Sequence, residues 1–558
     1  MKSLRANWFP FVLWIEVSLL AIAFMGDRPY LGLAIAVLGG VALGWFGIAS
    51  AGEQVGQAKA GIKERGDTAT GLGAKARRAA LYRTLGPLAL YRTVQYGAQG
   101  QRAVQYGAEW IATHELWFLA VPVVLLILPH RIAPWGLIVI SLLWLIRWAA
   151  RRRITVRTPV DVHILGLLVM IPAALYASVD LAMSRIILYQ ILAGLALFYG
   201  LVNALRSERD VWRMAFLLAL GGGGIALIAP LGTMWGKSRL FNLPGVYERF
   251  PRLLTDLINA NVLAGALVLI VPIGISLLLK PRWSNFARPG SPDPGPKRGF
   301  GNPLRAFFLD PLRLALGLVL ALMLAITALT QSRGAYAALA VGMLLLAMLV
   351  NRWFIILSLV AGLGLATAIQ RIGIETLADL LLTTDALGGW ASRQEVWSRA
   401  IYMIQDFPYT GGGLGTFGKV VPVMYPYFLA GPDADIAHAH NLFLQVAVDL
   451  GLPGLAAFVG LFSGALMAAW KAYRAYGARK EVGPQGLALG LLISLIIMGI
   501  HGLTDSVTWG PARPSIIPWG IMGLTMALYR VSEKGRGKGA GEHRCGGACV
   551  GQGERVEV

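Results

Sequence analysis

Long runs of apolar residues, separated by short polar segments, are the dominant pattern of this sequence. Most runs extend for about 17–22 residues, and a helix of that length crosses the roughly 30 Å hydrocarbon core of a bilayer. A helix suits such a run because it satisfies every backbone hydrogen bond internally. The pattern predicts an all-α polytopic membrane protein with about 12–14 transmembrane helices and one long extracytoplasmic loop.

The polar segments divide the chain into six parts. We expect an N-terminal transmembrane hairpin, a basic cytoplasmic amphipathic insertion, a transmembrane helical core, an extracytoplasmic loop, C-terminal transmembrane helices and a disordered cytoplasmic tail. Their ranges, in that order, are 1–50, 51–115, 116–370, 371–440, 441–530 and 531–558. The run from 116 to 129 is barely long enough to span, so a re-entrant segment is the alternative there.

Composition agrees with the pattern. The 558 residues are 56% hydrophobic and only 14% charged, and the mean hydropathy is +0.61. These values exclude an ordinary soluble domain. The two cysteines, Cys545 and Cys549, both lie in the tail, so no disulfide framework is expected.

A net charge of +21 raises the question of nucleic-acid binding. In a membrane protein, however, Lys and Arg accumulate on cytoplasmic loops. The basic clusters fall on one side of the predicted helices, so we expect no nucleic-acid partner, a multi-pass protein of the cytoplasmic (inner) membrane in contact with membrane lipids, and both termini in the cytoplasm. The insertion 51–115 either lies on the anionic inner leaflet or forms a solvated helical segment.

Candidate chemistry is concentrated where the long loop meets a predicted helix. His438 and His440 stand two residues apart, and Asn441 immediately precedes an apolar run. A histidine can transfer protons near neutral pH. The alternative is that these are ordinary polar residues at the membrane interface.

Arginines on the expected outer face are the second unusual feature, because basic residues normally stay inside. They include Arg252, Arg333 and Arg393, and Asp505 and His501 are expected at the same face. A guanidinium group presents a planar donor fork suited to phosphate. The group indicates an anionic, phosphate-bearing ligand, whereas each arginine alone is explained by an ion pair or by a side chain that reaches the interface.

Other motifs exclude several classes of protein. The glycine-rich segment 408–418 has neither the lysine nor the flanking strand of a nucleotide-binding loop, so we expect a tight loop with close backbone approach. No pair of carboxylates suggests a metal-dependent glycosyltransferase, and the Cys-x3-Cys pair of the tail is only half of a zinc motif. We therefore expect no metal and no other cofactor.

Four blocks of the chain resemble the O-antigen ligase and O-antigen polymerase superfamily of bacterial membrane glycosyltransferases. The blocks are RLLTDLINANVLAGALVLIVPIG, TQSRGAYAAL, SRQEVWSRAIYMIQDFPYTGGGLGTF and AHAHNLFLQVAVDLGLPGL, and they occur in the family's order between about 240 and 530. They place Arg252, Asn261, Arg333 and the pair His440-Asn441 at the family's positions. Asp449 stands where the family more often has Glu, and the insertion 51–115 is not part of the pattern.

The resemblance implies transfer of a glycan from an undecaprenyl-pyrophosphate carrier to an acceptor hydroxyl on the outer face, without metal and with inversion. It implies that Arg252 and Arg333 bind the pyrophosphate and that His440 removes the acceptor proton. Arg393, His438, Asn441 and Asn261 are the expected substrate-binding residues. The acceptor is expected to be a glycolipid, a glycan or a protein.

Three alternatives remain open from the sequence. A repeat-unit polymerase and a protein O-oligosaccharyltransferase share the same four blocks. A transporter or flippase of lipid-linked glycans belongs to a different class, and its polar groups would lie near mid-membrane on broken helices.

Overall fold

The computed structural model describes a few positions between 105 and 119, and then residues 133–235, 258–279, 310–351, 353–376, 390–429, 436–510 and 515–546. The N-terminal hairpin, most of the insertion 51–115, Arg252 and the last twelve residues lie outside these ranges. The chain divides into two compact units, and the site described below lies in the larger one, Thr113–Leu145 with Arg153–Val558.

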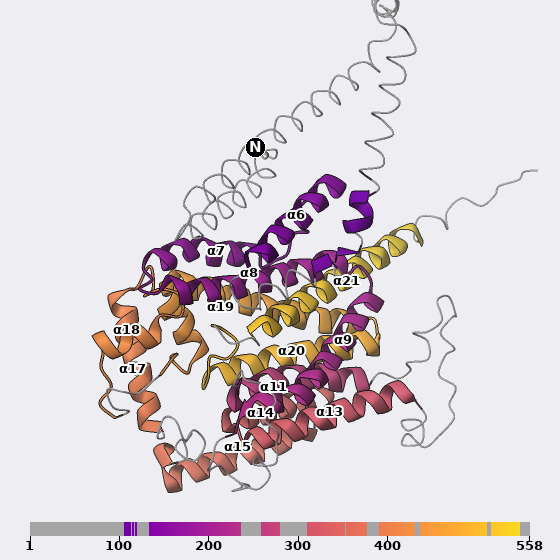
Figure 1. Cartoon of the computed structure of the whole chain (residues 1–558). Helices are drawn as coiled ribbons and strands as arrows, with labels where there is room; N and C mark the ends of the chain where they lie inside the picture. Colours follow the sequence, from indigo (N-terminus) through magenta and orange to yellow (C-terminus); the bar gives the residue numbers. More distant parts are fainter. Residues whose placement is uncertain are drawn as a thin grey trace, which may run out of the picture. The chain divides into compact units, whose positions relative to one another are not determined.

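The described part is almost entirely helical (Figure 1). Its long helices are α6 (Ala133–Arg151), α7 (Asp161–Tyr176), α8 (Leu181–Ala204), α9 (Glu208–Ile228), α11 (Ala260–Leu278), α13 (Pro311–Thr330), α14 (Arg333–Val350), α15 (Trp353–Ile372), α17 (Trp390–Asp406), α19 (Leu442–Ala478), α20 (Val482–Gly502) and α21 (Ile516–Gly546). Shorter elements are α18 (Phe417–Met424), η3 (Ala229–Gly232), and the two-residue parallel strands β1 (Thr233–Met234) and β2 (Ile258–Asn259).

Helix α20 lies inside the larger unit, where it packs against α19, α11 and α14 (Figure 1). Helix α19 also contacts α7 and α21, α21 packs along α8, and α11 contacts α9 and α13. Most side chains of α20 between Leu487 and Met498 are buried, and so is most of α11. A helix that is apolar on all faces is expected at such a central position.

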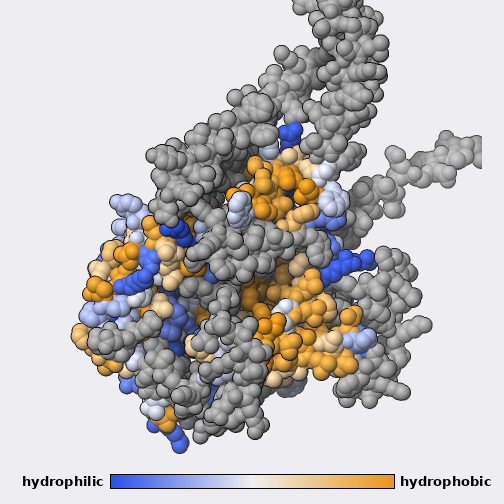
Figure 2. Space-filling view, viewed as in Figure 1, coloured by the Kyte–Doolittle hydropathy of each residue, from blue (hydrophilic) through white to orange (hydrophobic). Residues whose placement is uncertain are grey.

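Eight helices of the described residues are long and apolar enough to cross a membrane. Figure 2 shows a broad hydrophobic surface over the region of α9 and α13, with hydrophilic residues at its margins and around α17 and α18. The prediction of an all-α polytopic membrane protein is confirmed.

The C-terminal helices are longer than their apolar runs. Helix α19 continues to Ala478, and α21 continues to Gly546, so the expectation of a disordered tail from residue 531 is wrong as far as Gly546. One reason is a tertiary contact beyond the apolar run, because Arg479 donates a hydrogen bond of 2.9 Å to the carbonyl oxygen of Ser532. Polar helix formers such as Glu533 and Lys534 also favour continuation.

The segment between α15 and α19 forms a small helical layer at one end of the larger unit (Figure 1). Its helices α17 and α18 share a core with the segment that leads into α19. The buried members include Val396, Met403, Phe417, Ile436 and Ala439. Since Ala439 separates the two histidines, this core fixes the backbone on which both are placed.

Candidate functional site

The loop that contains the two histidines ends in an unusual backbone conformation. His440 has φ +48°, in the left-handed region that few non-glycine residues occupy. The next residue, Asn441, caps α19 by accepting hydrogen bonds from the amides of Phe443 and Leu444. A strained conformation held by a capped helix is typical of functional positions.

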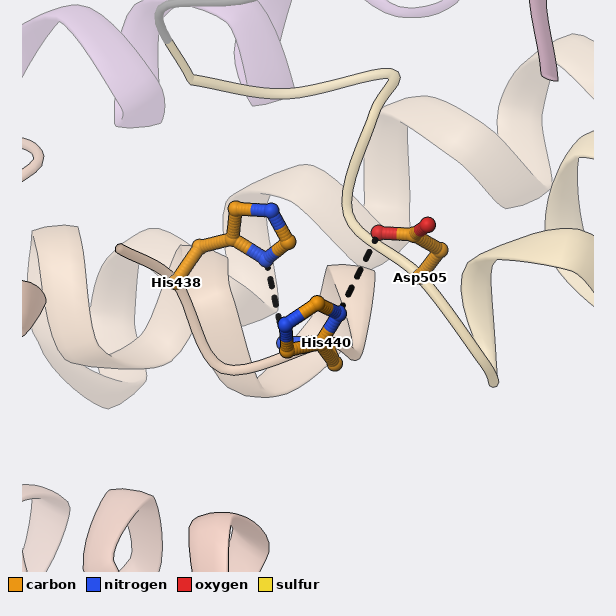
Figure 3. Close-up of side chains that lie close together, drawn as sticks. All are labelled: His438, His440 and Asp505. Carbon is orange, nitrogen blue, oxygen red and sulfur yellow. Dashed lines mark hydrogen bonds and ion pairs between the residues drawn. The ribbon is translucent and has the colours of Figure 1, made fainter. Parts of the chain in front are cut away.

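The imidazole of His440 lies between His438 and Asp505 (Figure 3). The two histidine rings have their centroids 4.1 Å apart, and Nδ1 of His438 accepts a hydrogen bond from the backbone amide of His440. Nδ1 of His440 faces Oδ1 of Asp505 at 3.7 Å. This distance is longer than a hydrogen bond, and catalytic contacts often shorten only when substrate binds.

The pKa values of Asp505 and His438 fit proton transfer at the ring between them. Burial is the main influence on Asp505 and raises its pKa, but His440, His438 and His501 outweigh it and hold the pKa below the ordinary range. Burial lowers the pKa of His438 to about 4, with a further contribution from the charge of His440. At neutral pH, Asp505 is therefore ionised and His438 is neutral.

The carboxylate orients the ring of His440. An ionised Asp505 facing Nδ1 favours the tautomer with the proton on that atom. The other nitrogen, Nε2, then has a free lone pair that can accept a proton from a substrate hydroxyl. The arrangement is that of a histidine general base with a carboxylate partner.

The short segment after α20 joins the other site residues. Asn441 donates a hydrogen bond to the carbonyl oxygen of Leu503, and Arg393 donates one to the carbonyl oxygen of Thr504. A side chain at Gly334, next to Arg333, would come within 2.5 Å of Thr504 Oγ1. The segment 503–505 therefore brings together the beginnings of α14, α17 and α19.

Arg393 is a buried cation at the centre of this arrangement. Only 4% of its surface is exposed, and its Nε atom has no hydrogen-bond partner among the described residues. Burial lowers its pKa, and the charge of Asp505 partly offsets that effect. A buried guanidinium with an unused donor is suited to an anionic ligand.

The remaining predicted residues differ in where they lie. Arg333 is the first residue of α14 and is half-buried. Asn261 lies in the first turn of α11, and its buried Oδ1 atom has no hydrogen-bond partner in the part of the chain that the structure describes. Both stand at the end of the helices where His440 lies, whereas Arg252 is outside the described residues.

His438, His440 and Asp505 are close enough to hold a metal ion, since their ligand atoms lie within 4.8 Å of one another. Two observations argue against a metal ion here. Nδ1 of His438 already accepts a hydrogen bond, and the buried guanidinium of Arg393 lies in the electrostatic field of Asp505 and His438. A fixed positive charge disfavours a divalent cation beside it.

The glycine-rich segment is a tight loop, as predicted. Gly411 has φ +69°, and a side chain there would come within 2.7 Å of the backbone of Asp449. A side chain at Gly413, with φ +104°, would meet the backbone of Ser178 at 2.6 Å. The loop therefore lies between α19 and the α7–α8 turn, where only glycine permits such close approach.

The sequence pattern predicts Asp505 at the outer face but indicates no role for it. Its partner His440 is 65 residues away in the chain, and no local pattern connects the two. The available signal was a carboxylate immediately after an apolar helix, one turn beyond His501.

Comparison with known proteins gives one match. A protein-family model described as O-antigen ligase matches residues 318–459. The matched range includes Arg333, Arg393, His438 and His440, and ends before Asp505. No curated protein matches the chain.

Proposed function

We propose that the chain is a membrane glycosyltransferase of the O-antigen ligase superfamily, and the match of the family model over residues 318–459 supports this. The proposed reaction moves a glycan from an undecaprenyl-pyrophosphate carrier to an acceptor hydroxyl. The observation that supports it most is the pairing of His440 with Asp505 beside the buried cation Arg393.

In this reaction the acceptor oxygen attacks the anomeric carbon of the donor sugar. A new glycosidic bond forms as the bond to the pyrophosphate oxygen breaks, and the carrier pyrophosphate leaves with the electron pair. Nε2 of His440 takes the acceptor proton. Attack on the face opposite the leaving group inverts the anomeric centre.

The cationic groups have a different role. Negative charge develops on the pyrophosphate as its bond breaks, and positioned donors that meet this charge lower the barrier. Arg333 and Arg393 are the described candidates, and Arg252 is proposed as a third from the sequence. Asn441 and Asn261 would hold neutral parts of the substrate. No step requires a metal.

We propose that the site faces the outside of the cytoplasmic membrane and that both termini are cytoplasmic. The helix ends opposite the site support this orientation because they are rich in Lys and Arg, as cytoplasmic ends usually are. These residues are Arg206, Arg209, Arg213, Arg313, Lys471, Arg474, Arg479, Lys480 and Lys534.

A transporter of the same lipid-linked glycan is less well supported. The described histidines and arginines of the site gather at one end of the helices rather than at their middle, where transporters hold their substrates. A repeat-unit polymerase or a protein O-oligosaccharyltransferase would use the same groups with a different acceptor.

Reconstitution tests the proposal. The purified protein in liposomes, supplied with an undecaprenyl-pyrophosphate glycan and glycolipid, glycan or peptide acceptors, should form a glycosylated acceptor and release the carrier pyrophosphate. Arg333→Ala should lower the rate by about 10²-fold or more, because one charge-stabilising donor is typically worth that much. A metal chelator should leave the rate unchanged. Movement of the lipid across the bilayer without transfer would favour a transporter instead.

A further inference from the structure

A second carboxylate, Asp449, lies beneath the site without touching the groups that react. It is in α19, two residues before the glycine at which the helix is interrupted, and it is completely buried. Its oxygens accept three hydrogen bonds of 2.9 Å, from the amide of Gly415 and the side chains of Gln445 and Trp509. All three donors are neutral.

The first connection runs from Asp449 to the histidine loop. Gln445 donates to Asp449 with its Nε2 atom and accepts, with Oε1, a hydrogen bond of 2.8 Å from the amide of Ala439. Ala439 lies between His438 and His440 and is buried. The Gln445 side chain therefore fixes the backbone at Ala439, and with it the positions of the histidines on either side.

The second connection runs to the carboxylate that faces His440. The indole of Trp509 donates to Oδ2 of Asp449, and the backbone amide of Trp509 donates to the carbonyl oxygen of Ser506. The amide of Ser506 donates a hydrogen bond of 2.8 Å to Oδ1 of Asp505. This is the same oxygen that faces Nδ1 of His440.

The third connection fixes the glycine loop. The amide of Gly415 donates to Asp449, and the amide of Gly412 donates a hydrogen bond of 2.8 Å to the carbonyl oxygen of Val448. After the break at Gly451, which has φ +71°, the amide of Leu452 donates a hydrogen bond of 2.7 Å to the carbonyl oxygen of Pro408. One short stretch of α19 thus binds both ends of the loop.

A buried carboxylate whose partners among the described residues are all neutral contributes little to the stability of a helix bundle. Removing a carboxylate from water is unfavourable, and apolar side chains of similar size usually stabilise a core better. Three directed acceptor positions, in contrast, fix three loops relative to one another. Geometry rather than stability explains the choice of residue.

We propose that Asp449 is a positioning residue: it holds His440, through Gln445, and Asp505, through Trp509, in register with each other. This role rests on the proposed glycosyl transfer, because it is the alignment of the His440–Asp505 pair that benefits. Asp449 itself does not contact the reacting groups.

Substitutions that cut one connection at a time test the role. Asp449→Asn keeps an oxygen for Gly415 and Gln445 but presents an amide to the indole of Trp509. Trp509→Phe removes the same hydrogen bond from the other side and keeps a ring to pack against Phe458. Each variant should lower kcat about tenfold and change KM for the lipid-linked donor less than about threefold. The double variant should be no slower than the slower single one.

Ser494→Ala is the matched control. Its hydroxyl is fully buried and donates to the carbonyl oxygen of Leu269, so the variant loses one buried hydrogen bond of α20 far along the helix from the site. It should keep the wild-type kcat. An equal loss of kcat in this control, additive losses in the double variant, or an unchanged kcat in Asp449→Asn would each overturn the positioning role.

Amide hydrogen exchange separates this proposal from the proposed function. Gln445→Met should speed exchange at Ala439, and Asp449→Asn should speed exchange at Gly415 less than at residues 505–509. A wild-type protein that transfers no sugar would contradict the proposed function, and the exchange data would still decide whether Asp449 positions the loops. Unchanged exchange at Ala439 and at 505–509 would show that it does not.

Discussion

Single residues of the site combine strain, burial and charge in a way that ordinary loop residues do not. His440 adopts a left-handed backbone, and its ring meets an ionised carboxylate on one side and a neutral histidine on the other. Arg393 is buried with an unused donor. Each of these features costs stability on its own, so their presence together indicates selection for binding or chemistry.

Asp505→Asn should lower kcat by about 10- to 10²-fold. The amide keeps the shape of the side chain but loses the charge that favours the Nδ1 proton of His440, and wrong tautomers are poor bases. Asp180→Asn is the control, because Asp180 pairs with Lys419 on the surface, away from His440. A rate for Asp505→Asn equal to that of the control would contradict the role of Asp505.

The stability of the protein should fall as the pH drops from about 6.5 to 4. Because the pKa of His438 is lowered to about 4 in the folded protein, the unfolded chain binds the extra proton first, and stability rises with pH over this window. The effect on the free energy of unfolding is at most about 3.5 kcal/mol, at about 1.4 kcal/mol per pH unit. The melting temperature of His438→Gln in detergent should therefore fall less between pH 7 and pH 5 than that of the wild type. An equal fall would contradict the lowered pKa.

At the scale of elements, the candidate site is formed by the breaks between helices rather than by the helices themselves. The turn at 331–332, the segment 503–509 and the interruption of α19 at Gly451 all lie at the same end of the larger unit. Apolar helices of similar length supply a rigid frame, and the site is built on the ends of that frame. The glycine loop joins this end to the α7–α8 turn.

Gly411→Ala should destabilise the protein by more than about 1 kcal/mol. Its φ of +69° is unfavourable for alanine, and the added carbon would lie 2.7 Å from the backbone of Asp449. Gly362→Ala in α15 is the matched control, since nothing lies within 4 Å of the added carbon. The melting temperatures of the two variants check this. Similar melting temperatures for the two variants would contradict the prediction, because the loop would then be able to move away from α19.

For the whole molecule, the sequence predicted the class of fold because the length and spacing of apolar runs depend on the bilayer rather than on tertiary packing. Eight helices of the described residues are long and apolar enough to cross a membrane, and α8 (Leu181–Ala204) is one of them. Apolar runs do not show where a helix ends. Helix α19 continues beyond its apolar run to Ala478, and Tyr476 is buried in this added part.

The site was only partly predictable. The histidines, Arg333 and Arg393 were found as unusual polar residues, and the structure brings His438 and His440 together with Arg393 through the segment 503–505. The role of Asp505 depends on its contact with His440, 65 residues away in the chain. The role of Asp449 depends on hydrogen bonds to two other segments, at Gly415 and Trp509. Local pattern contains no information about such contacts.

The most direct test of the account is the rate of sugar transfer by His440→Ala in liposomes, compared with wild type and with His163→Ala. His163 lies in the first turn of α7, at the opposite end of the helices, and packs against Gly460. Because a general base is lost, kcat of His440→Ala should be lower by about 10²- to 10⁴-fold. This variant should still bind the lipid-linked donor, and the control should have a near-normal kcat. Equal transfer rates for His440→Ala and wild type would contradict the account.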